Sequence, residues 1–231
     1  MSISKELTEI LNQQGCHIVG YADLRSLASE SRENFNYAVV MGTTFSKEAM
    51  VENINNQPQR YYDEYGTMDK KRNELRETVI SFLNGKGYKA LGDAPIFDGY
   101  NEILRAPLSF QTVATLAGLG WRGNCSILMT PQSGGALRLT IVLTNAPLEC
   151  GQPITKSKCP PNCTICADVC PGKAPSGKLW DSTINRDDLF NAFDCQKAAR
   201  ERARKLVGKN MSLCGLCISH CPITKKALGY K

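Results

Sequence analysis

Cysteines are the residues of this chain whose type and spacing point most directly to chemistry. The segment CPPNCTICADVCPGK, residues 159–173, holds four cysteines within twelve residues, and a proline follows the last of them. Three kinds of chemistry use such clusters: disulfide formation, zinc binding and the ligation of iron–sulfur clusters. Eight of the 11 cysteines lie in the last third of the chain, at Cys159, Cys163, Cys166, Cys170, Cys195, Cys214, Cys217 and Cys221.

The two cysteine groups share one spacing. The pattern C-x2-C-x3-C-P occurs at residues 163–171 and again at residues 214–222. Bacterial two-cluster ferredoxins carry C-x2-C-x2-C-x3-C-P, in which three cysteines bind one cluster and the fourth binds the other. Zinc sites use two pairs of ligands and give no role to a further cysteine three residues later. The spacing therefore favours two 4Fe-4S clusters, with zinc and disulfides as the alternatives.

The ferredoxin rule also predicts which cysteines share a cluster. Cluster I takes three thiolates from the first group and one from the second: Cys159, Cys163, Cys166 and Cys221. Cluster II takes Cys170, Cys214 and Cys217, and the lone Cys195 supplies the fourth ligand. Three residues rather than two separate Cys159 from Cys163, so Cys159 departs furthest from the pattern.

Length and composition describe an ordinary globular protein. The chain has 231 residues, and 42% of them are hydrophobic. Its first residues, MSISKELTEILNQQG, lack the apolar block and cleavage site of a signal peptide. No segment approaches the roughly 20 apolar residues that cross a bilayer. We therefore expect a cytoplasmic protein with no membrane contact, whose reduced thiols bind metal more readily than they form disulfides.

Charge divides the chain. Residues 1–150 have a net charge of −2 and residues 151–231 a net charge of +8. Each all-cysteine 4Fe-4S cluster brings a charge of about −2, which reduces the excess of the second part to about +4. The basic run KAARERARKLVGK, residues 197–209, is accordingly interpreted as the solvated face of a helix rather than as a tRNA site.

The first part of the chain has the pattern of a mixed α/β domain. Helical periodicity predicts helices over residues 4–14, 67–84 and 109–119. Apolar runs predict strands at residues 17–24, 37–45, 88–92, 126–130 and 136–144. The predicted architecture is an α/β (α+β) domain over residues 1–150, followed by a small ferredoxin-like domain with two clusters over residues 151–231.

Residues 108–148, LSFQTVATLAGLGWRGNCSILMTPQSGGALRLTIVLTNAPL, followed by the two cysteine groups, resemble the epoxyqueuosine reductase-like proteins, which are relatives of the reductive dehalogenases. The similarity is greatest to short members that carry a double 4Fe-4S cluster domain. It implies that clusters pass electrons to a cobalamin on the α/β domain, where epoxyqueuosine in tRNA is reduced. It also implies cofactor contacts from the AGLGW region: Gly118, Gly120, Trp121, Gly123, Asn124 and Cys125.

Those residues also have plainer interpretations. The glycines are equally consistent with a helix end and a tight turn, and Trp121 with an anchor at a domain interface. Cys125 is consistent with a small buried apolar residue, and Cys16 and Cys150 with spare thiols.

The chain also departs from the family pattern. Leu104 stands where the resemblance places an acidic proton donor, and Asn124 stands where it places a lysine. Asp98 or Glu102 takes the place of this acid only if the loop that carries them follows a different path. The chain ends ten residues after Cys221, without the helical-repeat domain that places full-length members on tRNA. We therefore expect tRNA to be an unlikely partner and epoxyqueuosine reduction to be negligible.

The sequence is consistent with three functions. The first is an iron–sulfur protein that transfers low-potential single electrons to a cofactor, substrate or partner, with a donor such as a ferredoxin or flavodoxin. The second is a cobalamin-dependent reductase that acts on tRNA or on a small-molecule substrate. The third is a binding module in which the clusters only stabilise the fold.

Overall fold

The computed structural model describes residues 2–92, 102 and 104–231. These residues form two compact units built from alternating segments of the chain. The first unit comprises Met1–Thr43, Met68–Leu119 and Arg138–Ile154, and the second comprises Thr44–Thr67, Gly120–Leu137 and Thr155–Lys231. The units therefore do not follow the single boundary predicted at residue 150. None of the described helices is both long and apolar enough to cross a membrane.

A four-stranded sheet forms the centre of the first unit. Its strand order is β1-β2-β6-β3, with β1 at Ile18–Asp23, β2 at Tyr37–Thr44, β6 at Leu137–Thr144 and β3 at Ala90–Gly92. Strands β1 and β2 are antiparallel, with Ile18 opposite Gly42. Strands β3 and β6 are also antiparallel. A short 3-10 helix, η1 at Glu30–Arg32, lies between β1 and β2 in the sequence.

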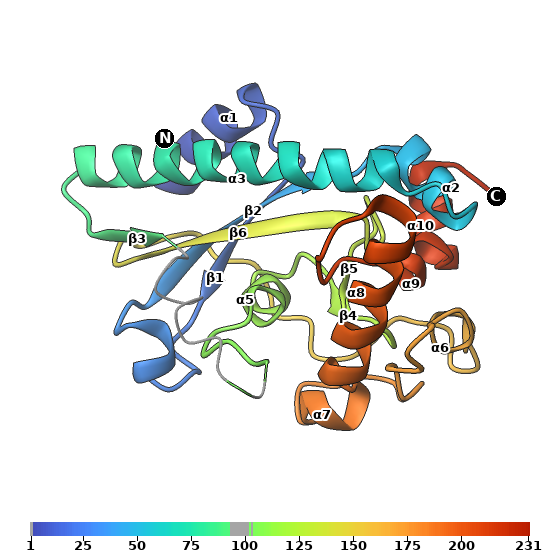
Figure 1. Cartoon of the computed structure of the whole chain (residues 1–231). Helices are drawn as coiled ribbons and strands as arrows, with labels where there is room; N and C mark the ends of the chain where they lie inside the picture. The colour runs from blue at the N-terminus through green and yellow to red at the C-terminus, as the bar shows by residue number, and fades with distance from the viewer. Residues whose placement is uncertain (1, 93–101, 103) are drawn as a thin grey trace. The chain divides into compact units, whose positions relative to one another are not determined.

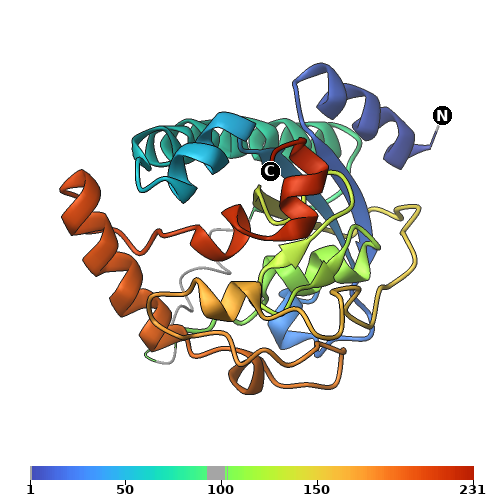
Figure 2. The ribbon, with the colours of Figure 1, turned by 90° about the vertical axis from the view of Figure 1, so that its right-hand side faces the viewer.

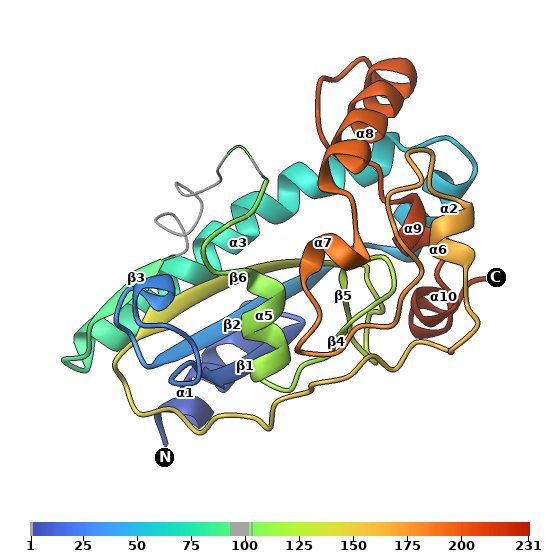
Figure 3. The same ribbon diagram turned by 90° about the horizontal axis from the view of Figure 1, so that it is seen from below.

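Helices cover both faces of this sheet. Helix α1 spans Ile3–Gln13 and begins at Ser2, whose side chain accepts a hydrogen bond from the backbone N–H of Lys5. Helix α3 spans Gln59–Gly85, and its part from Met68 onward belongs to the first unit. Helices α1 and α3 lie on one face of the sheet (Figure 1). Helix α5, at Phe110–Leu116, contacts β1 from the other face (Figure 3).

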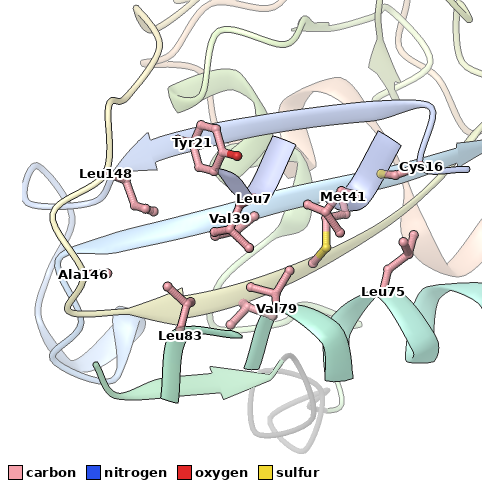
Figure 4. Close-up of a cluster of buried hydrophobic side chains, with 12 residues drawn as sticks. Leu7, Cys16, Tyr21, Val39, Met41, Leu75, Val79, Leu83, Ala146 and Leu148 are labelled. Carbon is pink, nitrogen blue, oxygen red and sulfur yellow. The ribbon is translucent and has the colours of Figure 1, made fainter. Parts of the chain in front are cut away.

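The core of the first unit lies between the sheet and the α1 and α3 helices (Figure 4). Val39 and Met41 point from β2 into a cluster that includes Leu7 of α1 and Leu75 of α3. Val40, between them, is also fully buried. Because neighbouring strand residues point to opposite faces, a strand that is covered on both sides is apolar throughout. This explains the continuous apolar run of β2.

The second unit consists of short helices and one small hairpin. Its elements are α2 (Lys47–Ile54), β4 (Trp121–Arg122), β5 (Leu128–Met129), α6 (Ile165–Asp168), α7 (Arg186–Leu189), α8 (Ala192–Val207), α9 (Leu216–Ser219) and α10 (Pro222–Leu228). Strands β4 and β5 are antiparallel. Helix α9 contacts α2, α6 and α10, and Figure 2 shows α6 and α9 side by side.

The mixed α/β class predicted from the sequence is confirmed. The long helix predicted from residue 67 instead begins at Gln59, directly after Pro58. Its first eight residues, QRYYDEYG, lack regular apolar spacing, so periodicity alone does not detect them. Helix α2 was not predicted, and it belongs with the cysteine-rich segments.

Candidate metal centre

One cavity in the second unit is lined by four cysteines from two distant segments. Three of them belong to the first cysteine group, namely Cys159, Cys163 and Cys166, and the fourth is Cys221 of the second group. The cavity encloses about 340 Å³ of empty space, part of it open to solvent. The rest of its lining is mostly apolar and includes Met129, Pro160, Ile165, Pro222 and Ile223. These four thiols are the set that the sequence assigns to cluster I.

Short helices position two thiols of this first set, Cys166 and Cys221. Cys221 is the residue before α10, and Pro222 takes the first helical position, where a missing N–H costs nothing. Backbone N–H groups of Ile223 and Thr224 donate to the Cys221 sulfur. Burial raises the pKa of Cys221, and these hydrogen bonds partly offset that rise. Cys166 is buried within α6.

The other four thiols of the C-terminal groups form a second set. Cys195 lies on α8, close enough to Cys217, Cys170 and Cys214 for their charges to act on it. Burial is the main cause that raises the pKa of Cys195 to about 12, and the neighbouring thiols add to it. Cys170 is buried and accepts a hydrogen bond from the N–H of Ala174 at 3.4 Å. These are the four cysteines that the sequence assigns to cluster II, and their binding of a cluster stays a prediction.

A buried polar network holds the segment that carries Cys214. Asn53 of α2 is fully buried, and its amide nitrogen donates to the carbonyl oxygen of Cys214 at 3.1 Å and to Oγ of Ser219 at 2.9 Å. The guanidinium of Arg202, on α8, donates to the same carbonyl at 3.5 Å. The hydroxyl of Tyr62 donates to the carbonyl oxygen of Leu213. These contacts explain why residues 44–67 belong to the second unit.

Asn124 and Cys125 also line the cavity of the first set. The amide nitrogen of Asn124 donates to the carbonyl oxygen of Cys163 at 3.3 Å. Its amide oxygen is buried and has no hydrogen-bond partner among the described residues. The side chain of Cys125 is buried and lines the same cavity as Cys166. Interaction with Cys125 is the first cause that lowers the pKa of Cys166 to about 7, and interaction with Cys166 raises the pKa of Cys125.

The donor set fits iron–sulfur chemistry. All eight donors are cysteine sulfurs, they fall into two sets of four, and apolar side chains line the first set. Cubane clusters take four thiolates each, and thiolates are soft ligands suited to them. Within residues 2–92, 102 and 104–231, no group of three or more His, Cys, Asp or Glu side chains is arranged to hold a single metal ion.

The residues expected to contact cobalamin are divided between the two units. Gly118 belongs to the first unit, whereas Gly120, Trp121 and Gly123 belong to the second. A Cβ atom on Gly118 would lie 2.5 Å from the carbonyl oxygen of Gln152, and one on Gly120 would lie 2.1 Å from that of Met129. Close contact with neighbouring backbone therefore explains why glycine stands at both positions. Gly123 donates its N–H to Ile127 in the β4–β5 turn.

Trp121 is 95% buried, and its indole N–H has no hydrogen-bond partner among the described residues. The ammonium of Lys158 lies 5.8 Å from the centre of its ring. A buried indole N–H normally finds an acceptor. Within the described part of the chain, Trp121 is thus a residue of the predicted cobalamin set with a buried side-chain donor that is not used.

The remaining predicted residues lie in the first unit or outside the described part. Asp98 falls outside the described residues, and Glu102 is exposed. Leu104 is half-buried and has a left-handed backbone with φ of 53°. Cys16 is buried and donates to the carbonyl oxygen of Ile18 at 3.1 Å, and Cys150 is half-buried.

Comparison with curated proteins relates the chain to one enzyme family. It is 34% identical over 120 residues to the epoxyqueuosine reductase of Bacillus anthracis, covering 51% of this chain and 30% of that protein. It is 38% identical over 152 residues to the epoxyqueuosine reductase of Cyclobacterium marinum, covering 58% and 44%. The chain is a relative of the epoxyqueuosine reductases. It spans less than half the length of these relatives, and no family model matches it.

Solved structures place this relative of the epoxyqueuosine reductases in the same fold. The epoxyqueuosine reductase of Streptococcus thermophilus superposes with a TM-score of 0.62 at 15% identity, over 97% of this chain and 67% of that one. The reductive dehalogenase NpRdhA gives a TM-score of 0.62 at 17% identity, over 95% and 31%. The predicted resemblance to epoxyqueuosine reductases and reductive dehalogenases is therefore confirmed.

Proposed function

We propose that this protein is an iron–sulfur reductase related to the epoxyqueuosine reductases, and that it carries two 4Fe-4S clusters. The observation that best supports this proposal is the grouping of eight thiols into two groups of four. Each group is drawn from two or three separate segments of the chain. Cys159, Cys163, Cys166 and Cys221 would hold one cluster, and Cys170, Cys195, Cys214 and Cys217 the other. When bound, such clusters supply one-electron transfer at potentials set by their surroundings.

The similarity to enzymes favours a reductase over a free electron carrier. Both curated relatives named above are reductases, and one matching structure is described as a reductive dehalogenase with B12-dependent dehalogenation. A carrier needs only its clusters, whereas this chain also builds a covered sheet with its own core. We infer that the first unit contributes to substrate handling. An external donor such as a ferredoxin or flavodoxin would supply the electrons.

The protein's own side chains would bind the clusters and keep water away from them. The apolar lining contributed by Met129, Ile165 and Ile223 lowers the local dielectric around the first set. The guanidinium of Arg202, beside Cys214, supplies positive charge near the second set. Cobalamin is not assigned a step, because backbone atoms fill the space next to Gly118 and Gly120.

The substrate class that the relatives suggest is a modified tRNA. One matching epoxyqueuosine reductase was solved with an epoxyqueuosine-modified tRNA stem loop. This finding counts against the expectation that tRNA is an unlikely partner. An epoxyqueuosine-containing stem loop is therefore the first substrate to test, and a small molecule is the alternative.

The decisive experiment is anaerobic reconstitution of the full chain, followed by spectra and turnover with and without added cobalamin. We expect reduced clusters to be reoxidised by a substrate in a catalytic cycle. A protein whose clusters exchange electrons only with a donor protein, and that reduces no stem loop or small molecule, would instead be an electron carrier. A change in the cobalamin spectrum on mixing would add that cofactor to the enzyme.

A further inference from the structure

Helix α8 carries an exposed stripe that combines three cations with an aromatic ring. The stripe consists of Phe193, Lys197, Arg200 and Arg204, and we call it the α8 stripe. All four residues are exposed, and Phe193 is 55% exposed. Their spacing of i, i+4, i+7 and i+11 places them within about 60° around the helix and about 16 Å along it. Helix α8 lies at the edge of the second unit (Figures 2 and 3), so the stripe presents one surface to solvent.

The opposite face of α8 belongs to the second cysteine set. Cys195 lies about 160° around the helix from the centre of the stripe. Ala199, one turn further along that face, is buried. A Cβ atom on Gly172, two residues after Cys170, would lie 2.9 Å from that of Ala198. The α8 stripe and Cys195 are therefore separated by no more than the thickness of one helix, about 10–12 Å with its side chains.

The described residues offer no ion pair to the cations of the stripe. The ion pairs within the described ranges do not involve Lys197, Arg200 or Arg204. Arg204 donates instead to the amide oxygen of Asn210 at 2.9 Å. Phenylalanine is among the residues most often buried, so an exposed Phe193 beside these cations needs an explanation. Arginine and aromatic side chains are enriched where proteins bind each other, and opposite charges across an interface accelerate association. The stripe therefore fits an acidic protein surface.

Two observations favour a protein over a nucleic acid as the partner. The exposed acids Asp194 and Glu201 lie beside the stripe on the same helix, where they interrupt the positive surface that a continuous phosphate backbone would follow. Separate carboxylates of a protein pair with individual cations and avoid these acids. The second observation is position, because a protein on the stripe lies one helix away from Cys195. Electron-transfer complexes are small, so one helix face provides much of the contact that they need.

We propose that the α8 stripe is the docking surface for an acidic protein of the flavodoxin type that carries single electrons, and that the cluster held in part by Cys195 receives those electrons. This inference rests on the proposed function, since it requires that cluster. In the transfer step the reduced carrier loses one electron and the oxidised cluster gains it, and no bond forms or breaks. Phe193 provides the apolar centre of the contact, and the three cations steer the carrier to it.

The test measures binding of an oxidised flavodoxin with negative net charge to the full, anaerobically reconstituted chain, by calorimetry at low and high salt. Native protein should bind, and binding should weaken as salt rises, because exposed charges are screened beyond about 10 Å at 0.1 M. The triple variant Lys197→Gln, Arg200→Gln, Arg204→Gln should bind about tenfold more weakly at low salt, with a flatter salt dependence. Phe193→Ala should weaken binding at both salt concentrations. Each variant should keep the iron content of the native protein.

A charge-matched control separates docking on the stripe from net charge. The triple variant Lys47→Gln, Lys156→Gln, Lys226→Gln loses three exposed cations of the second unit that lie outside α8. It should bind flavodoxin as the native protein does. Stopped-flow electron transfer from reduced flavodoxin should slow in the stripe variant and not in this control. A basic cytochrome, offered to the native protein in place of flavodoxin, should not bind.

Contrary results overturn the inference in distinct ways. Equal flavodoxin binding by the native protein and the stripe variant would overturn it, as would equal losses in the stripe variant and the charge-matched control. Failure of the native protein to bind flavodoxin at low salt would also overturn it. If the stripe variant lost affinity for an epoxyqueuosine-containing stem loop and not for flavodoxin, the stripe would be a nucleic-acid surface instead. A native chain without iron would overturn the proposed function, whereas an iron-loaded chain with any of the results above would overturn only this inference.

Discussion

Arg202 donates a hydrogen bond from Nη1 to the carbonyl oxygen of Cys214 at 3.5 Å. Its Nη2 donates to the carbonyl oxygen of Asn53 at 3.0 Å and to Oδ1 of Asn56 at 3.4 Å. The residue is 91% buried, and within the described ranges no carboxylate lies at ion-pair distance from it. Burying a charge without an opposite charge is costly. A cluster dianion held by Cys214 would supply that opposite charge.

We therefore expect Arg202→Gln to lower the potential of one cluster and to leave the other nearly unchanged. Removing a nearby positive charge disfavours the more negative reduced state. A change of about 59 mV corresponds to a factor of ten for a one-electron couple, and we expect a shift of that order. Arg204→Gln on the same helix is the control, because Arg204 is exposed and its guanidinium donates to Asn210. Equal shifts in both variants would contradict a specific role for Arg202.

The burial of Arg202 could not be predicted from the sequence. The run at residues 197–209 was predicted to be a solvated helix face, and its charge pattern supports that interpretation for Arg204. For Arg202 the prediction was wrong, because Asn53 of α2 contacts its guanidinium. Helix α2 lies far away in the sequence and carries no periodic signal strong enough to place it there. Burial created by a distant element is not visible in local charge patterns.

The cysteine spacing was more informative. It predicted the two sets of four thiols, because the order of ligands in a two-cluster motif already encodes which thiols approach each other. In the structure four of these thiols line one cavity and the other four lie near one another, whereas the division into two cluster-binding sets stays a prediction. The AGLGW region was harder to interpret. Its residues divide between the two units, and Asn124 and Cys125 line the cysteine cavity, which the chain order alone does not reveal.

Cross-ligation between the cysteine groups can be tested by combining substitutions. Cys170→Ser should remove one cluster, or about four of eight iron atoms. Adding Cys195→Ser should cost no further iron, because both residues serve the same cluster. Adding Cys221→Ser instead should remove the second cluster as well. Iron assays on the single and double variants check this, with Cys150→Ser as the control outside the sets. A double variant of Cys170 and Cys195 that loses both clusters would contradict the assignment.

Two left-handed glycines offer a matched comparison. Gly215 and Gly208 have φ of 74° and 65°, so alanine is strained at either position. A Cβ on Gly215 would lie 2.6 Å from the ring of Tyr61, whereas nothing lies within 4 Å at Gly208. Gly208→Ala should cost about 1 kcal/mol and keep the iron. Gly215→Ala should displace the segment of Cys214 and Cys217 and reduce the iron content. Equal iron contents in the two variants would count against this account.

Leu104 limits the chemistry expected with epoxyqueuosine. Reduction of an epoxide needs a proton donor near the leaving oxygen, and a missing general acid typically costs about 10²- to 10⁴-fold in rate. Leu104→Asp should therefore raise turnover of an epoxyqueuosine stem loop, and aspartate also tolerates the left-handed backbone at this position. Leu104→Asn is the control, because it has a similar shape without the acid. Equal rates for the native, Asp and Asn proteins would show that the proton comes from elsewhere.

The measurement that tests the central claim most directly is the iron and sulfide content of the anaerobically purified chain, taken together with its visible spectrum before and after dithionite. Two clusters on eight cysteines predict about eight iron and eight sulfide per chain. They also predict a broad visible absorption that dithionite bleaches. Stoichiometric zinc with no iron and no sulfide would contradict the account.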